Sequence, residues 1–134
     1  PYGEAGVVAN FAARMLNRGQ PIINGSGEQE RDFVYVGDIA RANVLSLTAG
    51  SGEILNLGSG VGTSVNTIFA QLKEITGSTC AEKHGPAKKG EVFHIYLDAT
   101  RAWNVLGWRA EVPLAQGLLW TVDYFRSIRR DHTA

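Results

Sequence analysis

The sequence predicts an α/β fold, because stretches in which apolar residues recur every three or four positions alternate with short β-rich runs. The 134 residues are the length of one domain, and 44% of them are hydrophobic, which is enough to build a core. The chain contains no internal repeat and no linker-like segment. We therefore predict a single domain over residues 1–134, with a frayed tail at 129–134.

Each helix and strand is predicted from an apolar pattern that is bounded by breaking or capping residues. In chain order we predict a helix at 6–18, strands at 21–23 and 33–36, a helix at 39–48, a strand at 54–57, a helix at 63–76, a strand at 92–97, and helices at 100–106 and from 113 onward. The intervening turns are rich in glycine, asparagine and serine, which are typical turn residues.

The helix boundaries depend on residues that cap or stop helices. Gly19 and Pro21 end the first helix, and Pro113 suits the start of the last one. Side-chain oxygens can accept the free N–H groups of a first turn. On that ground the predicted N-caps are Asp38, Thr63 or Ser64, and Thr100. The last helix is expected to bury Leu114, Leu118, Leu119, Val122 and Phe125.

Charge and cysteine content narrow the classes of function. Thirteen basic and thirteen acidic residues cancel, which argues against a nucleic-acid or membrane-surface protein with its basic excess. No apolar run approaches the roughly 18 residues of a membrane span, and no signal peptide is recognisable. The single cysteine, Cys80, fits a reducing compartment. We therefore expect a cytoplasmic protein that binds neither nucleic acid nor membrane.

A glycine-rich turn, LNLGSGVGTS at 55–64, raises the question of a phosphate-binding loop. Its glycines at 58, 60 and 62 do not have the G-x-G-x-x-G spacing of a dinucleotide fingerprint. The Gly-Lys-Ser/Thr sequence that places an ammonium on phosphates in a P-loop is missing too. We interpret this segment as a tight strand-to-helix turn in which glycine supplies positive φ.

The segment GSGEQERDFVYVGDIA at 25–40 resembles the G-D-G-x-Q-x-R-D-F-x-Y-V-x-D motif of NAD-dependent nucleotide-sugar epimerases and dehydratases, the extended short-chain dehydrogenases. Further segments resemble the same family in the same order along the chain. They are GEAGVVANFAARML, GEILNLGSGVGTSV, KKGEVFHIYLDATRAWNVLGW and PLAQGLLWTVDYF. Together they run from about Gly3 to Arg126. Within the family, the likeness is greatest to the UDP-glucose (UDP-galactose) 4-epimerases.

The resemblance covers only the C-terminal, substrate-binding portion of such enzymes. The family's N-terminal Rossmann half binds NAD and carries a Tyr-x-x-x-Lys pair for hydride chemistry. Here the residues four positions after the tyrosines are Gly6, Ile39, Thr100 and Ile128, and none is lysine. We therefore expect a substrate-binding lobe without catalytic or cofactor-binding residues, inactive alone. The full-length family enzyme would use NAD, and this chain is expected to bind none.

Three charged residues are the candidate ligands of a nucleotide. The resemblance assigns Arg31 to the diphosphate, where its planar fork can pair two oxygens. It places Lys88 where relatives have a second phosphate-binding arginine, so the charge is kept without the fork. It assigns Glu91 to the ribose hydroxyls. The alternative for Arg31 is a surface ion pair with Asp32 or Glu30. For Lys88 the alternative is an ordinary solvated lysine, and for Glu91 it is a charge at the edge of a strand.

Apolar and amide residues complete the candidate site. The resemblance aligns Ile22, Ile23 and Asn24 with the segment that contacts uracil, although many relatives have an aromatic residue in place of Asn24. It aligns Ile95 with the position that gates the sugar pocket, and the alternative there is an ordinary core isoleucine.

The remaining polar and aromatic residues are predicted to be structural. Asp38 and Asp98 are expected to cap helices, and Asp32 to support Arg31 or the local turn. The histidines have no ligand partners at metal spacing, so no metal site is predicted. The tryptophans fit apolar patterns of the core; they are Trp103, Trp108 and Trp120.

Three hypotheses of function remain open. The chain is the UDP-sugar-binding portion of an epimerase, part of a related 4,6-dehydratase or decarboxylase, or a free-standing, non-catalytic α/β module. The expected partners are a UDP-sugar and the missing Rossmann half, whose sheet the strand at 54–57 would join. Without that half the strand's apolar edge would be exposed, so we also expect a homo-oligomer.

Overall fold

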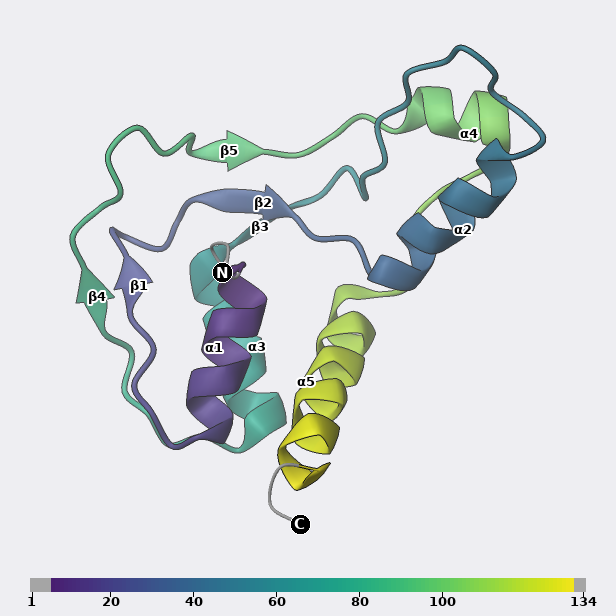
Figure 1. The fold of residues 1–134 in the computed structure, drawn as a ribbon. Coiled ribbons are helices and arrows are strands. Elements are labelled where there is room, and N and C mark those ends of the chain that lie inside the picture. Colours follow the sequence, from purple (N-terminus) through teal and green to yellow (C-terminus); the bar gives the residue numbers. More distant parts are fainter. Residues whose placement is uncertain (1–5, 132–134) are drawn as a thin grey trace.

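The computed structural model describes residues 6–131, and this part of the chain forms five helices and five very short strands (Figure 1). They are α1 (Val7–Leu16), β1 (Ile23–Asn24), β2 (Glu30–Asp32), α2 (Val36–Ser46), β3 (Gly62–Ser64), α3 (Val65–Thr76), β4 (His84–Gly85), β5 (His94–Ile95), α4 (Thr100–Leu106) and α5 (Leu114–Asp131). The predicted α/β class is confirmed, and no described helix is long and apolar enough to cross a membrane.

The main core lies between α1, α3 and α5, which pack against one another below β2, β3 and β5, with β1 and β4 to their left (Figure 1). Each helix contributes apolar side chains three or four positions apart, as the sequence predicts. The buried members are Phe11, Ala12, Met15, Val65, Ile68, Phe69, Leu72, Leu118 and Val122, joined by Ile23 from β1. The rings of Phe11 and Phe69 meet edge to face with centroids 5.7 Å apart, a favourable aromatic geometry.

Two small sheets lie beside this helical core. β1 pairs in parallel with β4, so that Asn24 lies opposite Gly85. In the other sheet β2 is central, antiparallel to β3 and parallel to β5, and Arg31 lies opposite both Thr63 and Ile95. The β2–β5 pairing thus places Arg31 beside Ile95, and the β1–β4 pairing places Asn24 beside the start of the loop that carries Lys88 and Glu91.

A second, smaller cluster forms an arm in which α2 packs against α4 (Figure 1, upper right). Its centre is Trp108, which is fully buried and donates its indole N–H to the Asp38 carbonyl at 2.7 Å. The Asp38 carboxylate accepts the backbone N–H groups of Glu111 and Val112 and pairs with Arg41. Burial alone would raise the pKa of Asp38, but these donors outweigh it and lower the pKa.

All five predicted helices are present with somewhat different bounds, and several of their ends are set by capping residues. The Ser64 hydroxyl accepts the Thr67 N–H at the start of α3, and Gly77 and Gly107 end α3 and α4 in the left-handed conformation. Asp98 accepts the Thr100 N–H at the start of α4, and hydrogen bonding to the Thr100 side chain and then to this N–H lowers the pKa of Asp98. Thr100 is therefore the first helical residue rather than the cap. The helix α5 continues to Asp131, and residues 132–134 of the predicted frayed tail lie outside the described residues.

The predicted strands differ most from the structure. The strand expected at 33–36 is wrong: the ladder of β2 ends at Asp32, where its partner β3 begins at Gly62, and Val36 already starts α2. Asp38 is thus inside the first turn of α2, not its N-cap, and its carboxylate is used by residues 111 and 112. The segment 54–57 is not a strand, since no described strand pairs with it, and Ile54 is 88% exposed.

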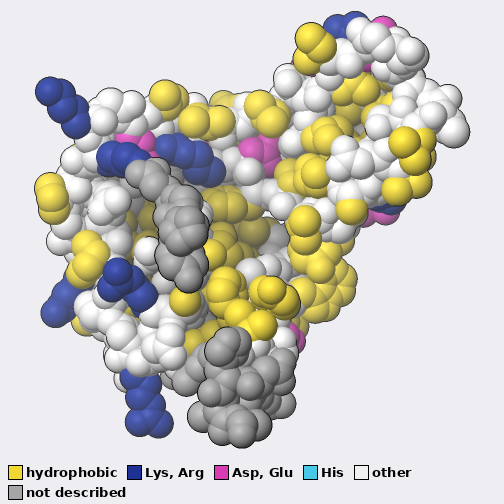
Figure 2. Space-filling view, in the orientation of Figure 1, with side chains coloured by type: hydrophobic (Ala, Val, Ile, Leu, Met, Phe, Trp, Pro, Cys, Tyr) yellow, Lys and Arg dark blue, Asp and Glu magenta, His cyan; other side chains and the backbone are white. Residues whose placement is uncertain are grey.

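The prediction of buried tryptophans holds for one of three. Trp108 is buried, whereas Trp103 and Trp120 are 52% and 44% exposed. Leu119 on α5 is also exposed instead of buried. Figure 2 shows apolar side chains along α5 and on the face between α5 and the α2–α4 arm. We refer to Tyr35, Val36, Leu119, Trp120 and Tyr124 as the apolar band.

Candidate nucleotide-binding site

A pocket of about 460 Å³ opens between α1, the β1 turn and the segment before β5. It is lined by Val7, Asn10, Phe11, Arg14, Ile22, Asn24, Gln29, Val65, Lys88 and Glu91. Other hollows have volumes of about 490, 530 and 480 Å³, so size alone does not single out this one. What distinguishes it is the mixture of an apolar floor with cations, amides and one carboxylate, which is typical of sites for polar ligands.

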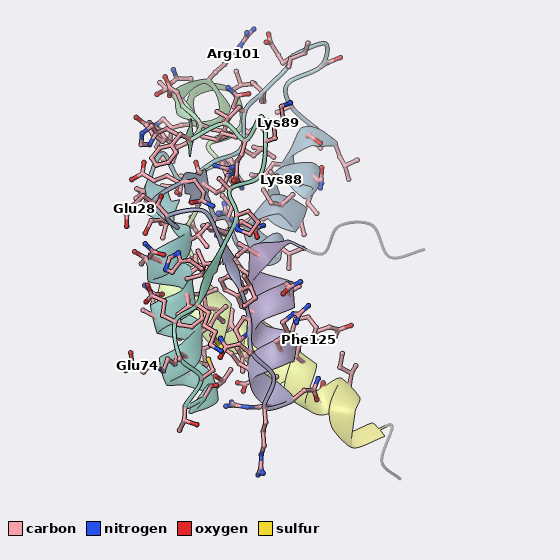
Figure 3. All side chains as sticks on the ribbon, turned by 90° about the vertical axis from the view of Figure 1, so that its left-hand side faces the viewer. Glu28, Glu74, Lys88, Lys89, Arg101 and Phe125 are labelled. Carbon is pink, nitrogen blue, oxygen red and sulfur yellow. The ribbon has the colours of Figure 1, made fainter. Side chains whose placement is uncertain are left out.

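Four of the seven predicted ligand residues line this pocket. Ile22 and Asn24 form one wall, and Lys88 and Glu91 come from the loop between β4 and β5. Figure 3 shows Lys88 and Lys89 on that loop. The two groups are more than sixty residues apart in sequence, and the parallel pairing of β1 with β4 brings their segments together.

Arg31 lies next to this pocket and is tied to it by an ion pair. Its Nη2 donates to Glu91 Oε1 at 2.8 Å, and its Nη1 donates to the Glu30 carbonyl at 2.6 Å. The side chains of Arg31 and Glu91 are each 27% exposed, so both stay accessible to a ligand. Arg31, which is predicted to bind the diphosphate, and Glu91, which is predicted to bind the ribose, are therefore held side by side.

Two predicted residues lie outside the pocket lining. Ile23 is completely buried in the main core, so only its backbone could contact a ligand. Ile95 lies opposite Arg31 on β5 and is 41% exposed, so it is not the core isoleucine of the alternative interpretation. The ligand roles of all seven residues stay predictions.

The structure adds pocket residues that sequence reasoning missed. Asn10 and Arg14 are one turn apart on α1, and Arg14 Nε donates to Asn10 Oδ1 at 3.0 Å. Gln29 is buried, and its Nε2 donates to the Asn24 carbonyl at 2.9 Å and to Glu91 Oε2 at 3.4 Å. The polar residues at 10 and 14, four positions apart on an amphipathic helix, were the signal available in the sequence for the first pair.

The glycine-rich turn at 58–62 wraps a carboxylate of the protein itself. Asp32 accepts the N–H and hydroxyl of Ser59 and the N–H groups of Gly60 and Leu97, at 2.6–3.1 Å. Burial alone would raise the pKa of Asp32, but these four donors outweigh it and lower the pKa. The donors that a phosphate would need are occupied, which confirms the local role of Asp32 and a turn with positive φ at Gly60. The turn does not join a strand to a helix as predicted, because 54–57 is not a strand and β3 lies between the turn and α3.

His84 ties the β1 turn to β4 beside the pocket. Its Nδ1 lies 2.7 Å from the Gly25 carbonyl oxygen, and its Nε2 lies 2.9 Å from Glu82 Oε1. Both partners only accept hydrogen bonds, so the doubly protonated imidazolium satisfies both contacts at once. The bonds to Glu82 and Gly25 raise the pKa of His84.

Comparison with known proteins finds a matching family and similar solved structures. Residues 1–58 match the model of the NAD dependent epimerase/dehydratase family. The crystal structure of UDP-glucose 4-epimerase from Thermotoga maritima with UDP-glucose is similar to 96% of this chain, at 49% identity and a TM-score of 0.92. This chain corresponds to 41% of that structure's chain.

Curated relatives also match most of this chain. UDP-glucose 4-epimerase of Mycolicibacterium smegmatis is 38% identical over 95% of this chain and 41% of its own length. UDP-glucuronic acid decarboxylase 1 of Xenopus tropicalis is 32% identical over 90% of this chain and 28% of its own length. The chain thus spans less than half the length of the relatives it matches.

Proposed function

Because the chain belongs to the NAD dependent epimerase/dehydratase family, we propose that it is the nucleotide-sugar-binding portion of a UDP-glucose 4-epimerase-like enzyme. The pocket between α1, the β1 turn and Glu91 then holds the nucleotide. The observation that carries this proposal is the Arg31–Glu91 pair at the edge of a pocket lined by Lys88 and Asn24. A UDP-sugar offers a diphosphate, a ribose and a uracil, and each has a partner of suitable chemistry there.

Each part of the nucleotide has a proposed partner. The guanidinium of Arg31 and the ammonium of Lys88 bind the diphosphate, because hydrogen bonds from cationic donors to phosphate oxygens are the strongest ones available. The carboxylate of Glu91 accepts hydrogen bonds from the ribose hydroxyls. Ile22 and the backbone of Asn24 contact the uracil, and Ile95 limits the space for the sugar. Binding energy from the nucleotide orients the distant reacting ring.

The residues of this chain do not fit the NAD that the family requires. The sequence has no G-x-x-G-x-x-G fingerprint, and the Ser59 and Gly60 N–H groups of the glycine-rich turn donate to Asp32. It also lacks the Tyr-x-x-x-Lys pair. We therefore assign substrate binding to this chain and no step of the hydride chemistry.

A Rossmann half is the proposed partner of the apolar band. The band exposes Leu119, Trp120 and Tyr124, and the Trp120 ring lies beside the half-buried Tyr35 ring, with centroids 5.0 Å apart. An exposed cluster of this kind is typical of a surface that another domain covers. The extended segment 54–57, with Ile54 almost fully exposed, is the proposed additional strand of that half's sheet.

A UDP-sugar decarboxylase is the second candidate, and the Xenopus relative supports it. Both reactions start from a UDP-sugar, so the same nucleotide pocket would serve either enzyme. The residues that would separate them belong to the sugar subsite and to the half that supplies the catalytic pair.

Calorimetric titration of the 134-residue chain with UDP, UDP-galactose and dTDP tests the proposal. We expect saturable UDP binding that weakens at least tenfold in Arg31→Ala, since a charge-assisted bond contributes about 1.5–3 kcal/mol. Arg101→Ala is the matched control, because Arg101 also pairs with a glutamate, Glu53, but lies on α4 (Figure 3). Absence of UDP binding at millimolar ligand, or equal weakening by both variants, would refute the nucleotide pocket.

A further inference from the structure

Gln29 is buried at the wall of the nucleotide pocket, where its side chain is only 6% exposed. Among the described residues, only Gln29 and Asp38 combine a buried position with a polar or charged side chain. A buried amide costs free energy unless its hydrogen-bonding groups are used. The partners of Gln29 therefore indicate what this residue is for.

The amide nitrogen of Gln29 has two hydrogens and two partners. One is the carbonyl oxygen of Asn24 at 2.9 Å, and the other is Oε2 of Glu91 at 3.4 Å. These partners fix which way the amide faces, because its oxygen could not make either contact. The backbone is fixed as well, since the Gln29 carbonyl accepts the Val65 N–H at the start of α3.

The carboxylate of Glu91 is consequently held at both oxygens. Oε1 accepts from Arg31 and Oε2 accepts from Gln29, which fixes the rotation of the carboxylate about its last bond. Each oxygen has two lone pairs, so each keeps one for a ligand. The Gln29 amide thus links the Asn24 carbonyl in the pocket wall to the Glu91 carboxylate, which also accepts from Arg31.

We propose that Gln29 is a positioning residue that orients Glu91 toward the ribose hydroxyls and thereby sets a preference for ribonucleotides. This inference rests on the proposed function, because it needs a nucleotide in the pocket. It concerns only the hydroxyl contacts of the ribose. A nucleotide without those hydroxyls gains nothing from an oriented Glu91, so its affinity does not depend on Gln29.

The test compares UDP with 2′,3′-dideoxy-UDP in wild type and Gln29→Met, which keeps the length of the side chain and removes the donor. We expect UDP affinity to fall about five- to tenfold, because Glu91 stays in place but is less firmly oriented and loses only part of its charge-assisted bonding to the hydroxyls, while dideoxy-UDP affinity stays within twofold. Gln20→Met is the matched control. Its Nε2 also donates to two acceptors, which are the backbone carbonyls of Pro21 and Ala81, but Gln20 does not line this pocket. It should change neither affinity.

Two outcomes would overturn the role of Gln29 while leaving the nucleotide pocket intact. If Gln29→Met weakens both nucleotides equally, the residue only supports the fold. If it changes neither, Glu91 does not depend on it. A third measurement needs no ligand: exchange of the Arg31 guanidinium protons by NMR should quicken in Gln29→Met, because Glu91 is then less firmly held.

The NMR result separates the two proposals. Failure of wild type to bind UDP would refute the proposed function, and faster Arg31 proton exchange in Gln29→Met would still support the positioning of Glu91. Unchanged exchange would overturn the positioning whether or not UDP binds.

Discussion

Arg31 donates from Nη2 to Glu91 Oε1 at 2.8 Å, across sixty positions of sequence. The ion pair forms because β2 carries Arg31 beside β5, and the loop before β5 carries Glu91. The carboxylates of Glu30 and Asp32, the partners in the alternative interpretation of Arg31, are used elsewhere: Glu30 contacts His94, and Asp32 holds the turn at 59–60. The pair therefore connects the two sides of the site.

Replacement of Arg31 by alanine should affect binding far more than stability. Both partners are partly exposed, and ion pairs of that kind contribute only about 0–1 kcal/mol to folding. We expect the free energy of unfolding in urea to change by less than about 1 kcal/mol, with UDP affinity at least tenfold weaker. Arg31→Lys should recover part of the affinity, because it keeps the charge without the fork. Loss of more than about 3 kcal/mol of stability would show that Arg31 is primarily structural.

Asp32→Asn should destabilise the glycine-rich turn. The carboxylate accepts four hydrogen bonds, and an amide in its place would turn donors toward donors. We expect a loss of about 1–3 kcal/mol in urea unfolding and faster amide exchange at residues 59 and 60. Asp123→Asn, which alters an exposed pair on α5, is the control and should be nearly neutral.

The same carboxylate gives a pH dependence with a definite sign. The folded-state pKa of Asp32 lies below its ordinary value of 3.8, so its contribution is complete above that value. It is lost as the pH falls through the lowered pKa. The stability difference between wild type and Asp32→Asn should therefore shrink in strong acid, and a difference that stays constant down to pH 2 would contradict this.

His84 should stabilise the protein in acid more than in base. The pKa of His84 is raised above 6.5 by Glu82 and the Gly25 carbonyl, so its contribution is complete below 6.5. It is lost as the pH rises through the raised pKa. Urea unfolding from pH 5.5 to 9 should show the gap between wild type and His84→Asn closing with pH. In a Glu82→Gln background the stability difference made by His84→Asn should be smaller. A stability difference that widens as the pH rises would contradict the raised pKa of His84.

The apolar band predicts self-association of the 134-residue chain. Trp120 is 44% exposed beside Tyr35, and such clusters bury themselves against any available apolar surface. Light scattering should detect dimers or larger species whose proportion falls in Trp120→Lys. Trp103→Lys is the control, because Trp103 on α4 is slightly more exposed, at 52%, but lies outside the band. A monomer at the highest attainable concentration would contradict this prediction.

The sequence predicts the helices well because their information is local. Apolar spacing defines α3, the Ser64 hydroxyl begins it, and Gly77 ends it. The strands are two or three residues long, and their bounds depend on partners far away in sequence. The ladder of β2 therefore ends at Asp32, although the following residues, Phe33 to Tyr35, have higher β-propensity.

The candidate site was predicted as a set of charges, but its connections were not. Family resemblance singled out Arg31 and Glu91, whereas their mutual ion pair is created by the order of the strands. Gln29 was overlooked because its role depends on Asn24 and Glu91, which only the fold brings to it. The same holds for Asp38, whose partners are about seventy positions away.

An NMR titration of the isotope-labelled 134-residue chain with UDP, followed through backbone amide shifts, tests the nucleotide pocket most directly. We expect saturable shifts centred on Asn10, Asn24, Gln29 and Glu91, and none at the Asp32-bound turn or at Cys80. Shifts centred on Ser59 and Gly60 would mean that the glycine-rich turn, rather than the pocket beside α1, receives the nucleotide. Such a result, or the absence of saturable shifts, would contradict nucleotide binding in the pocket beside α1.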